Sequence, residues 1–329
     1  MPVPRTYHLV TLGCPKNDVD SEHLERLLTG GELVPVLQPG QADAIIVNTC
    51  GFIEQSQEES MEAVRQLAAA KHEGQTLIVA GCMTQLYGRQ VKEESPAIDH
   101  VFGVGQWQEV ARLLSVDVDA IFDIPESNVR VAGPSAYLKI SDGCDAPCAF
   151  CVIPRIKGGL RSAPAGLLVR EAQRLVAAGA KELVLVGQDT TAWGEDQGRP
   201  VGSGLPELLG ALSEAVGPDV WLRLMYAYPS RLSPALIEAM ATIPNVIPYL
   251  DVPLQHGSEA VLRRMKRPHN VDRVLRSIED LRRAVPGIVL RTSFIAGFPG
   301  ETDAEFKELL DFARTIEFDH AGCFTYLRQ

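Results

Sequence analysis

The hydrophobic pattern of the first third of the chain alternates between short continuous runs and helically spaced positions. Apolar runs of strand length lie at residues 8–12, 44–47 and 77–80. Helical spacing follows at 19–28 and 54–71, and a shorter helical segment lies at 110–114. This alternation predicts an N-terminal α/β domain with a doubly wound parallel sheet over residues 1–117.

The rest of the chain repeats strand and then helix. Apolar runs predict six strands, at residues 137–140, 182–186, 221–227, 249–254, 288–295 and 323–327. Helical spacing lies between them at 164–178, 206–215, 234–240, 271–284 and 303–315. Six such units predict a partial, open (βα)6 TIM-like barrel over 133–329, with its chemistry at the carboxyl ends of the strands. Two prolines within 124–134 favour a linker at 118–132.

Composition and charge narrow the class of protein. The 329 residues are 46% apolar and 22% charged, which is the balance of a globular chain long enough for two domains. The net charge of −11 excludes a broad basic surface and fits a basic protein substrate slightly better than RNA, although a solvated acidic surface explains it too. We find neither a secretory leader nor a bilayer-spanning apolar run. We therefore expect a cytoplasmic protein with no membrane partner, for which nucleic acid is not the primary partner.

Three of the seven cysteines form a compact loop directly after the first predicted barrel strand. Cys144, Cys148 and Cys151 have C-x3-C-x2-C spacing, and three thiolates on one short loop can bind three corners of a 4Fe-4S cube. The fourth iron is then open to a small molecule. Zinc is the alternative, but zinc sites usually take four ligands in paired C-x2-C spacing, and the nearby sequence offers no fourth cysteine or histidine.

Three further cysteines follow the three predicted strands of the N-terminal domain. Cys14, Cys50 and Cys82 come just after these strands, and the carboxyl ends of parallel strands form the edge of a sheet where ligands bind. Each cysteine alone is explained as a small buried apolar residue. Three at one edge favour a second three-cysteine cluster site.

The cysteine loop and its position resemble the radical S-adenosylmethionine superfamily, in which an aromatic residue such as Phe150 precedes the last cysteine. The resemblance implies that S-adenosylmethionine chelates the open iron and that one electron from the cluster cleaves it to a 5′-deoxyadenosyl radical. It also implies cofactor contacts at two strand ends, by Gln188 and Asp189 and by Gly297, Gly300 and Glu301. Both segments also fit simple turns.

Longer motifs resemble the methylthiotransferases, whose N-terminal α/β domain carries a second cluster that takes part in sulfur delivery. TLGCPKNDVDSE at 11–22, WLRLMYAYP at 221–229 and YLDVPLQHGS at 249–258 resemble the RimO-type branch, which modifies a ribosomal protein. The resemblance implies two 4Fe-4S clusters, S-adenosylmethionine and methylthiolation of the β-carbon of an aspartate in the twelfth protein of the small subunit. It further implies a flavodoxin or ferredoxin as electron donor, a sulfur source, and two clusters that face one cavity.

Two other functions remain open, namely a methylthiotransferase that forms 2-methylthioadenosine in tRNA, and a non-catalytic iron–sulfur or zinc protein.

The family normally continues into a C-terminal TRAM domain, so residues 327–329 are interpreted as a shortened tail and the TRAM domain as absent. Three smaller expectations concern single side chains. Asn17 or Asp18 is expected to cap a helix that begins near Val19, Cys323 is expected in the core, and Lys157 stands where the family has arginine.

Overall fold

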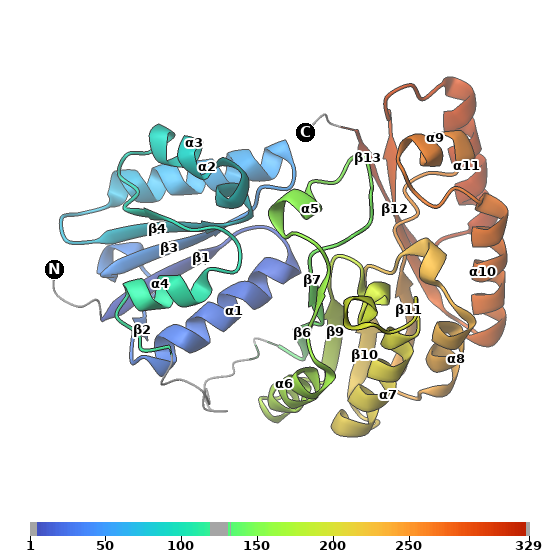
Figure 1. The fold of residues 1–329 in the computed structure, drawn as a ribbon, viewed down its shortest axis with the longest axis horizontal. Coiled ribbons are helices and arrows are strands. Elements are labelled where there is room, and N and C mark those ends of the chain that lie inside the picture. Colours follow the sequence, from blue (N-terminus) through green and yellow to red (C-terminus); the bar gives the residue numbers. More distant parts are fainter. Residues whose placement is uncertain (1–4, 119–130, 132, 327–329) are drawn as a thin grey trace. The chain divides into compact units, whose positions relative to one another are not determined.

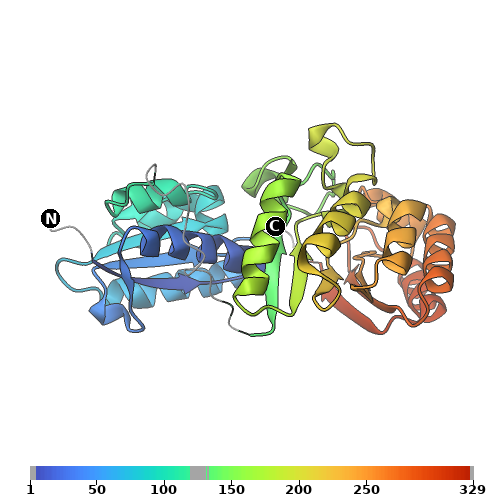
Figure 2. The same ribbon diagram turned by 90° about the horizontal axis from the view of Figure 1, so that it is seen from below.

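The computed structural model describes residues 5–118, 131 and 133–326, and its chain divides into two compact units (Figures 1 and 2). One unit contains the residues before 131 together with 155–157. The other contains 131–154 and the residues from 158 on. The predicted linker lies outside the described residues apart from 118 and 131, and the predicted tail at 327–329 lies wholly outside them.

The first unit is built on a five-stranded parallel sheet in the order β2-β1-β3-β4-β5. Its strands are β1 (Thr6–Thr11), β2 (Val34–Pro35), β3 (Ala44–Thr49), β4 (Thr76–Gly81) and β5 (His100–Val101). Its helices are α1 (Pro15–Gly30), α2 (Glu54–Ala70), α3 (Cys82–Glu94) and α4 (Trp107–Leu113). This confirms the predicted doubly wound sheet, because the strand order reverses between β1 and β3.

Alternating side chains of the central strand β3 explain why helices cover both faces of this sheet. Ala44 and Ile46 pack into an apolar cluster with α1 and α4, whereas Ile45 and Val47 pack into a second cluster with α2 and α3. Figure 1 shows the two helix pairs on opposite sides of the strands. Since successive side chains of a strand point to opposite faces, one short apolar run supplies both cores.

The start of α1 corrects one expectation. The helix begins at Pro15 rather than near Val19, with Cys14 at the N-cap and proline in the first turn, where its missing N–H costs nothing. Asn17 therefore lies inside the helix, so the cap predicted for Asn17 or Asp18 is wrong. The Asn17 amide instead donates to the backbone oxygens of Leu12, at 2.8 Å, and Thr49, at 3.3 Å.

The second unit contains six parallel strands in the order β13-β12-β11-β10-β9-β6. These are β6 (Ser135–Lys139), β9 (Glu182–Val186), β10 (Trp221–Leu224), β11 (Val246–Asp251), β12 (Val289–Ala296) and β13 (His320–Thr325). The helices between them are α6 (Ala165–Ala177), α7 (Gly204–Val216), α8 (Pro234–Thr242), α10 (Val271–Ala284) and α11 (Asp303–Ile316). The sheet has β6 and β13 at separate edges, so the predicted partial, open barrel is confirmed.

Short elements that the hydrophobic pattern did not predict decorate the carboxyl side of this barrel. They are α5 (Ile153–Ile156), α9 (Glu259–Arg264) and the antiparallel pair β7 (Ser141–Asp142) and β8 (Arg161–Ser162). Cys323 is in β13 as predicted, but its side chain is exposed like the rest of that edge strand, so the expectation of a core position is wrong. In the described part of the chain, none of the helices is both long and apolar enough to cross a membrane.

Candidate functional site

The loop with Cys144, Cys148 and Cys151 lies between β7 and α5, just past the carboxyl end of β6. Its backbone is fixed at three points: Cys144 N–H donates to Gly158 O at 3.2 Å, Ala149 N–H to Met265 O at 2.9 Å, and Cys151 N–H to Cys148 O at 3.2 Å. These hydrogen bonds hold the backbone that carries the three thiols.

Burial shifts the pKa of two of these thiols, Cys144 and Cys151. It raises the pKa of Cys144, and it raises the pKa of Cys151 to about 11, more than the nearby N–H groups and arginines lower them. Arg231 opposes the shift at Cys144 and Arg267 opposes it at Cys151. Metal binding must therefore displace the protons of these two thiols, and the thiolates that result bind metal.

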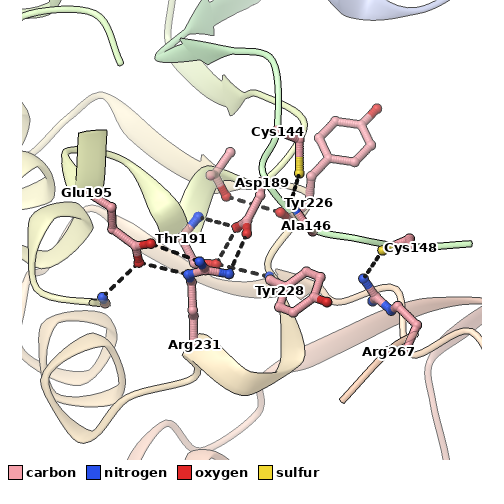
Figure 3. A network of polar contacts seen from close by, with 12 residues as sticks. Cys144, Ala146, Cys148, Asp189, Thr191, Glu195, Tyr226, Tyr228, Arg231 and Arg267 are labelled. Atoms are coloured by element: carbon pink, nitrogen blue, oxygen red, sulfur yellow. Dashed lines mark hydrogen bonds and ion pairs between the residues drawn. The ribbon is translucent and has the colours of Figure 1, made fainter. Parts of the chain in front are cut away.

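A buried polar network stands at the carboxyl end of β9, beside the cysteine loop (Figure 3). Asp189, only 2% exposed, accepts hydrogen bonds from the N–H of Thr191 at 3.0 Å and from its hydroxyl at 2.5 Å. Arg231 Nη1 donates to the other Asp189 oxygen at 3.0 Å, and its Nε and Nη2 donate to the Glu195 carboxylate at 2.8 Å each. Both carboxylate oxygens of Asp189 thus accept hydrogen bonds from the protein. Its contact with the cofactor stays a prediction.

Two buried oxygens near this network have no hydrogen-bond partner among the described residues. They are Ser141 Oγ and Gln188 Oε1. The Gln188 amide nitrogen donates to Asp142 at 3.1 Å, which fixes the side chain next to the cysteine loop. A side chain at Gly187 would meet Ser141 Oγ at 2.6 Å, so only glycine fits beside this hydroxyl. Unpaired buried oxygens are costly, and a bound ligand with an amino group would satisfy them.

Glu301, predicted as a cofactor contact, supports the turn after β12. One carboxylate oxygen accepts the Phe298 N–H at 2.9 Å, and the other lies 3.3 Å from His256 Nε2. His256 is fully buried, and its Nδ1 accepts the Ser258 N–H at 2.9 Å, so the proton of the neutral ring is on Nε2, toward Glu301. Burial lowers the pKa of His256, against the opposing effect of Glu301.

The glycines of the same turn have a conformational role. Gly297 and Gly300 have φ values of +77° and +79°, which side chains other than glycine rarely adopt. The turn thereby presents Phe298 to a small apolar cluster with Val261 and Met265, and Phe150 packs against this cluster. The aromatic of the cysteine loop is thus an anchor for that loop, and contact of these residues with adenine stays a prediction.

The second cysteine set converges at one edge of the first sheet. Cys14, Cys50 and Cys82 follow the neighbouring strands β1, β3 and β4. Burial raises the pKa of Cys82 to about 12, and the neighbouring Cys50 and Cys14 raise it further. Cys82 is the first residue of α3, at the positive end of the helix dipole.

A buried ion pair belongs to the same unit. Lys157 Nζ lies 2.9 Å from the carboxylate of Asp20, and the two side chains are 3% and 7% exposed. The Lys157 charge lowers the pKa of Cys82, against the larger effect of burial. Removing either side chain would take this counter-ion from a buried charge, which is costly.

The donor set of each cysteine group suits an iron–sulfur cube. In such a cube each thiolate binds a different iron, and thiolates are the usual protein ligands. Three cysteines would therefore hold three corners of a cube and leave the fourth iron to another ligand. Among the described residues, no three His, Cys, Asp or Glu side chains are placed to hold one metal ion.

Some residues of the site were not predicted from the sequence. Arg267 contacts Cys148 and stacks on Tyr228, and Arg231 binds Asp189 and Glu195 in the neighbouring polar network (Figure 3). Burial raises the pKa of Tyr228 to about 12, so its hydroxyl stays protonated. Tyr228 and Arg231 follow the end of β10, where a strand-end rule would have found them. Arg267 follows the short helix α9, and no local pattern marks it.

We expect Gly13→Ala to impair the second cysteine site. Gly13 has φ +108°, and a Cβ there would lie 2.8 Å from Cys50 Cβ and 3.0 Å from its sulfur. Displacing Cys50 should reduce bound iron from about eight toward about four per chain after anaerobic reconstitution. Gly74→Ala is the matched control, because its φ is +91° but nothing lies within 4 Å. Equal iron content in both variants would contradict this account.

Family models match both units of the chain. The model described as "Uncharacterized protein family UPF0004" matches residues 6–103, and that of the Radical SAM superfamily matches residues 138–313, which is more than half of the chain.

Curated relatives match nearly the whole chain. It is 43% identical over 350 residues to the ribosomal protein uS12 methylthiotransferase RimO of Chloroflexus aurantiacus, an alignment that covers 98% of this chain and 76% of the relative. It is 44% identical over 329 residues to the protein of the same name from Moorella thermoacetica, which covers 97% and 75%.

Solved structures of low identity share the fold. The methyltransferase TsrM of Kitasatospora setae, a radical S-adenosylmethionine enzyme, superposes with a TM-score of 0.69 at 15% identity, covering 99% of this chain and 76% of that one. The cobalamin-dependent radical enzyme OxsB gives a TM-score of 0.66 at 14% identity, covering 94% and 52%.

Proposed function

Because the chain belongs to the RimO family of ribosomal protein uS12 methylthiotransferases, within the radical S-adenosylmethionine superfamily, we propose that it methylthiolates an aspartate β-carbon in that ribosomal protein. The observation that carries the proposal is the presence of two separate three-cysteine sets, each at the carboxyl edge of its own parallel sheet. An aspartate β-carbon is not activated, so acid–base chemistry does not remove its hydrogen easily and radical chemistry is the suitable route.

Each cysteine set has its own task in this proposal. Cys144, Cys148 and Cys151 hold the cluster that binds S-adenosylmethionine, and Cys14, Cys50 and Cys82 hold the cluster concerned with the sulfur. When bound, the first cluster supplies the electron that cleaves S-adenosylmethionine to a 5′-deoxyadenosyl radical. The polypeptide keeps these thiols in place, partly excludes water from them and directs polar groups toward the substrates.

The protein's own polar groups suit the amino-acid part of S-adenosylmethionine. Ser141 Oγ and Gln188 Oε1 are buried acceptors to which no donor of the described residues reaches, and Gln188 is fixed beside the cysteine loop by Asp142. A protonated amino group there would gain charge-assisted hydrogen bonds. The role of Asp189 is indirect. Its carboxylate holds Arg231, and the charge of Arg231 lowers the pKa of Cys144 against the larger effect of burial.

The segment after β10 is held in a strained conformation that suits a binding surface. Tyr226 has φ +60°, a left-handed backbone conformation that costs a residue other than glycine about 1–2 kcal/mol. Two hydrogen bonds compensate, one from Tyr226 N–H to the Asp251 carboxylate at 3.2 Å and one from Ala227 N–H to Asp251 O at 2.9 Å. Strain of this kind, over-determined by its surroundings, is frequent at ligand sites. We infer that this segment faces bound substrate.

The proposal also requires partners that the chain itself does not supply. A soluble one-electron donor such as a flavodoxin or ferredoxin must reduce the first cluster, and a sulfur source must renew the second. Transfer of the methyl group to a sulfur nucleophile consumes a second S-adenosylmethionine. A ribosomal-protein substrate places the reaction in the cytoplasm.

The proposal is tested by the mass of the product. Reconstituted enzyme, S-adenosylmethionine and reductant are incubated separately with purified uS12 and with tRNA. We expect a gain of about 46 Da on the protein, because SCH3 replaces one hydrogen. The gain should map to a single aspartate. The same gain on tRNA alone would instead support the tRNA-modifying alternative.

Metal analysis separates the enzyme from a zinc or non-catalytic protein. We expect about eight irons and a similar amount of sulfide per chain after anaerobic reconstitution, which corresponds to two 4Fe-4S clusters. Stoichiometric zinc without sulfide would reject the radical reaction altogether.

A further inference from the structure

Arg267 is buried against one cysteine of the radical site. Its side chain comes from the turn after α9, and the residue is 8% exposed. One guanidinium nitrogen, Nη1, donates to Cys148 Sγ at 3.6 Å, which is within the range of a hydrogen bond to sulfur, and Nη2 donates to Pro253 O. The third nitrogen, Nε, is buried and has no partner among the described residues.

The same turn also clamps the cysteine loop through its backbone. Met265 O accepts the N–H of Ala149, the residue after Cys148, at 2.9 Å. Lys266 has φ +53°, which closes the helix and brings Arg267 back toward it, where its N–H bonds to Leu262 O at 2.9 Å. The Arg267 head group is therefore placed by a capped turn, and its approach to Cys148 is not a chance contact of a mobile surface side chain.

Tyr228 lies on the other side of this guanidinium. The Arg267 head group stacks over the Tyr228 ring with 4.2 Å between the guanidinium carbon and the ring centroid. The backbone N–H of Tyr228 donates to Thr191 Oγ1 at 3.0 Å, which fixes the ring beneath the guanidinium. Cys148 thus receives a cationic donor whose head group lies against an aromatic ring (Figure 3). The corresponding donor to Cys144 Sγ is a backbone N–H, that of Ala146 at 3.4 Å.

We propose that Arg267, oriented by Tyr228, is a positioning residue that raises the reduction potential of the cluster held by Cys144, Cys148 and Cys151. The inference rests on the proposed function, since it assigns that cluster to this loop. Reduction adds one negative charge to a cluster that is already anionic with its thiolates. A buried cation and N–H donors to the sulfurs stabilise the reduced form more than the oxidised form. A higher potential makes electron uptake from a soluble donor easier.

The test is a reduction titration of the reconstituted full-length protein, followed by electron paramagnetic resonance. The second cluster serves as an internal reference, and S-adenosylmethionine identifies the first cluster because it alters the signal of the cluster with the open iron. We expect Arg267→Met to disfavour the reduced form about tenfold, a shift of about 59 mV to lower potential for one electron, with the reference unchanged.

Two milder variants keep the inference testable if Arg267→Met loads poorly. Arg267→Lys keeps the charge without the planar fork, and Tyr228→Leu removes the ring on which the guanidinium stacks, so both should lower the potential by less. Arg263→Met is the matched control, because Arg263 is exposed on the same helix and should leave the potential unchanged.

The outcomes separate the inference from the proposed function. Fully loaded Arg267→Met, Arg267→Lys and Tyr228→Leu proteins with the wild-type potential would overturn the role of Arg267 and leave the function intact. Wild-type protein that forms no cluster at all would overturn both. An equal shift of both clusters would indicate a general loosening of the protein and would also contradict the inference.

Discussion

Replacing Cys148 by alanine should abolish reductive cleavage of S-adenosylmethionine. The cysteine loop has three thiols and, among the described residues, no further side chain placed to complete a metal site with them. Loss of one ligand should therefore release the cluster. Loss of a residue that only supports a metal ligand already costs about 10–100-fold, so loss of the ligand itself should exceed that range. The measurement is 5′-deoxyadenosine formed per chain under reducing, anaerobic conditions.

Two comparisons make this result specific to the first site. Cys323→Ala removes an exposed thiol of the edge strand β13 and should leave both iron content and cleavage unchanged. Cys148→Ala should retain about four irons, those of the other cysteine set. Persisting 5′-deoxyadenosine formation in Cys148→Ala would refute the assignment of this loop.

The order and type of most helices and strands could be predicted because each depends on local periodicity. Strand β3 is apolar at each position from Ala44 to Val47, and α11 has helical spacing with a capping box of Thr302 and Glu305. Helix α3 was missed for a local reason. It has a non-helical residue, Tyr87, followed by Gly88, and few apolar positions, so its periodicity is weak.

The positions of the six cysteines could be predicted because they follow strand ends, and parallel strands bring such ends to one edge of the sheet. The environment of the sulfurs could not. Arg267 reaches Cys148 across 119 positions of sequence, and this contact depends on a two-residue turn after α9. Likewise, Asp189 and Glu301 are polar residues at strand ends, but only the structure shows that their oxygens are occupied by Arg231, Phe298 and neighbouring groups. The local sequence pattern locates such polar side chains but does not reveal which groups they bind.

Replacing Cys82 by alanine should uncouple the two halves of the reaction. Cys82 is 7% exposed and begins α3, where alanine is a good helix former, so the fold should tolerate the change. The second cluster should be lost, which leaves about four irons per chain. Methylthiolated uS12 should fall by more than about 100-fold, since a metal ligand itself is removed. Cleavage of S-adenosylmethionine should continue, because the loop of Cys144, Cys148 and Cys151 is untouched.

The variants Cys82→Ala and Cys148→Ala together distinguish sulfur supply from radical generation. Both should lose the methylthiolated product, but only Cys148→Ala should lose 5′-deoxyadenosine. Cys82→Ala alone should continue to cleave S-adenosylmethionine while uS12 stays unmodified. The radical is still formed in this variant, but no sulfur donor is present to react with the substrate. Normal methylthiolation by Cys82→Ala protein with only four irons would show that the reaction does not need the second site. A loss of cleavage in Cys82→Ala would mean instead that the first site depends on the second for its assembly.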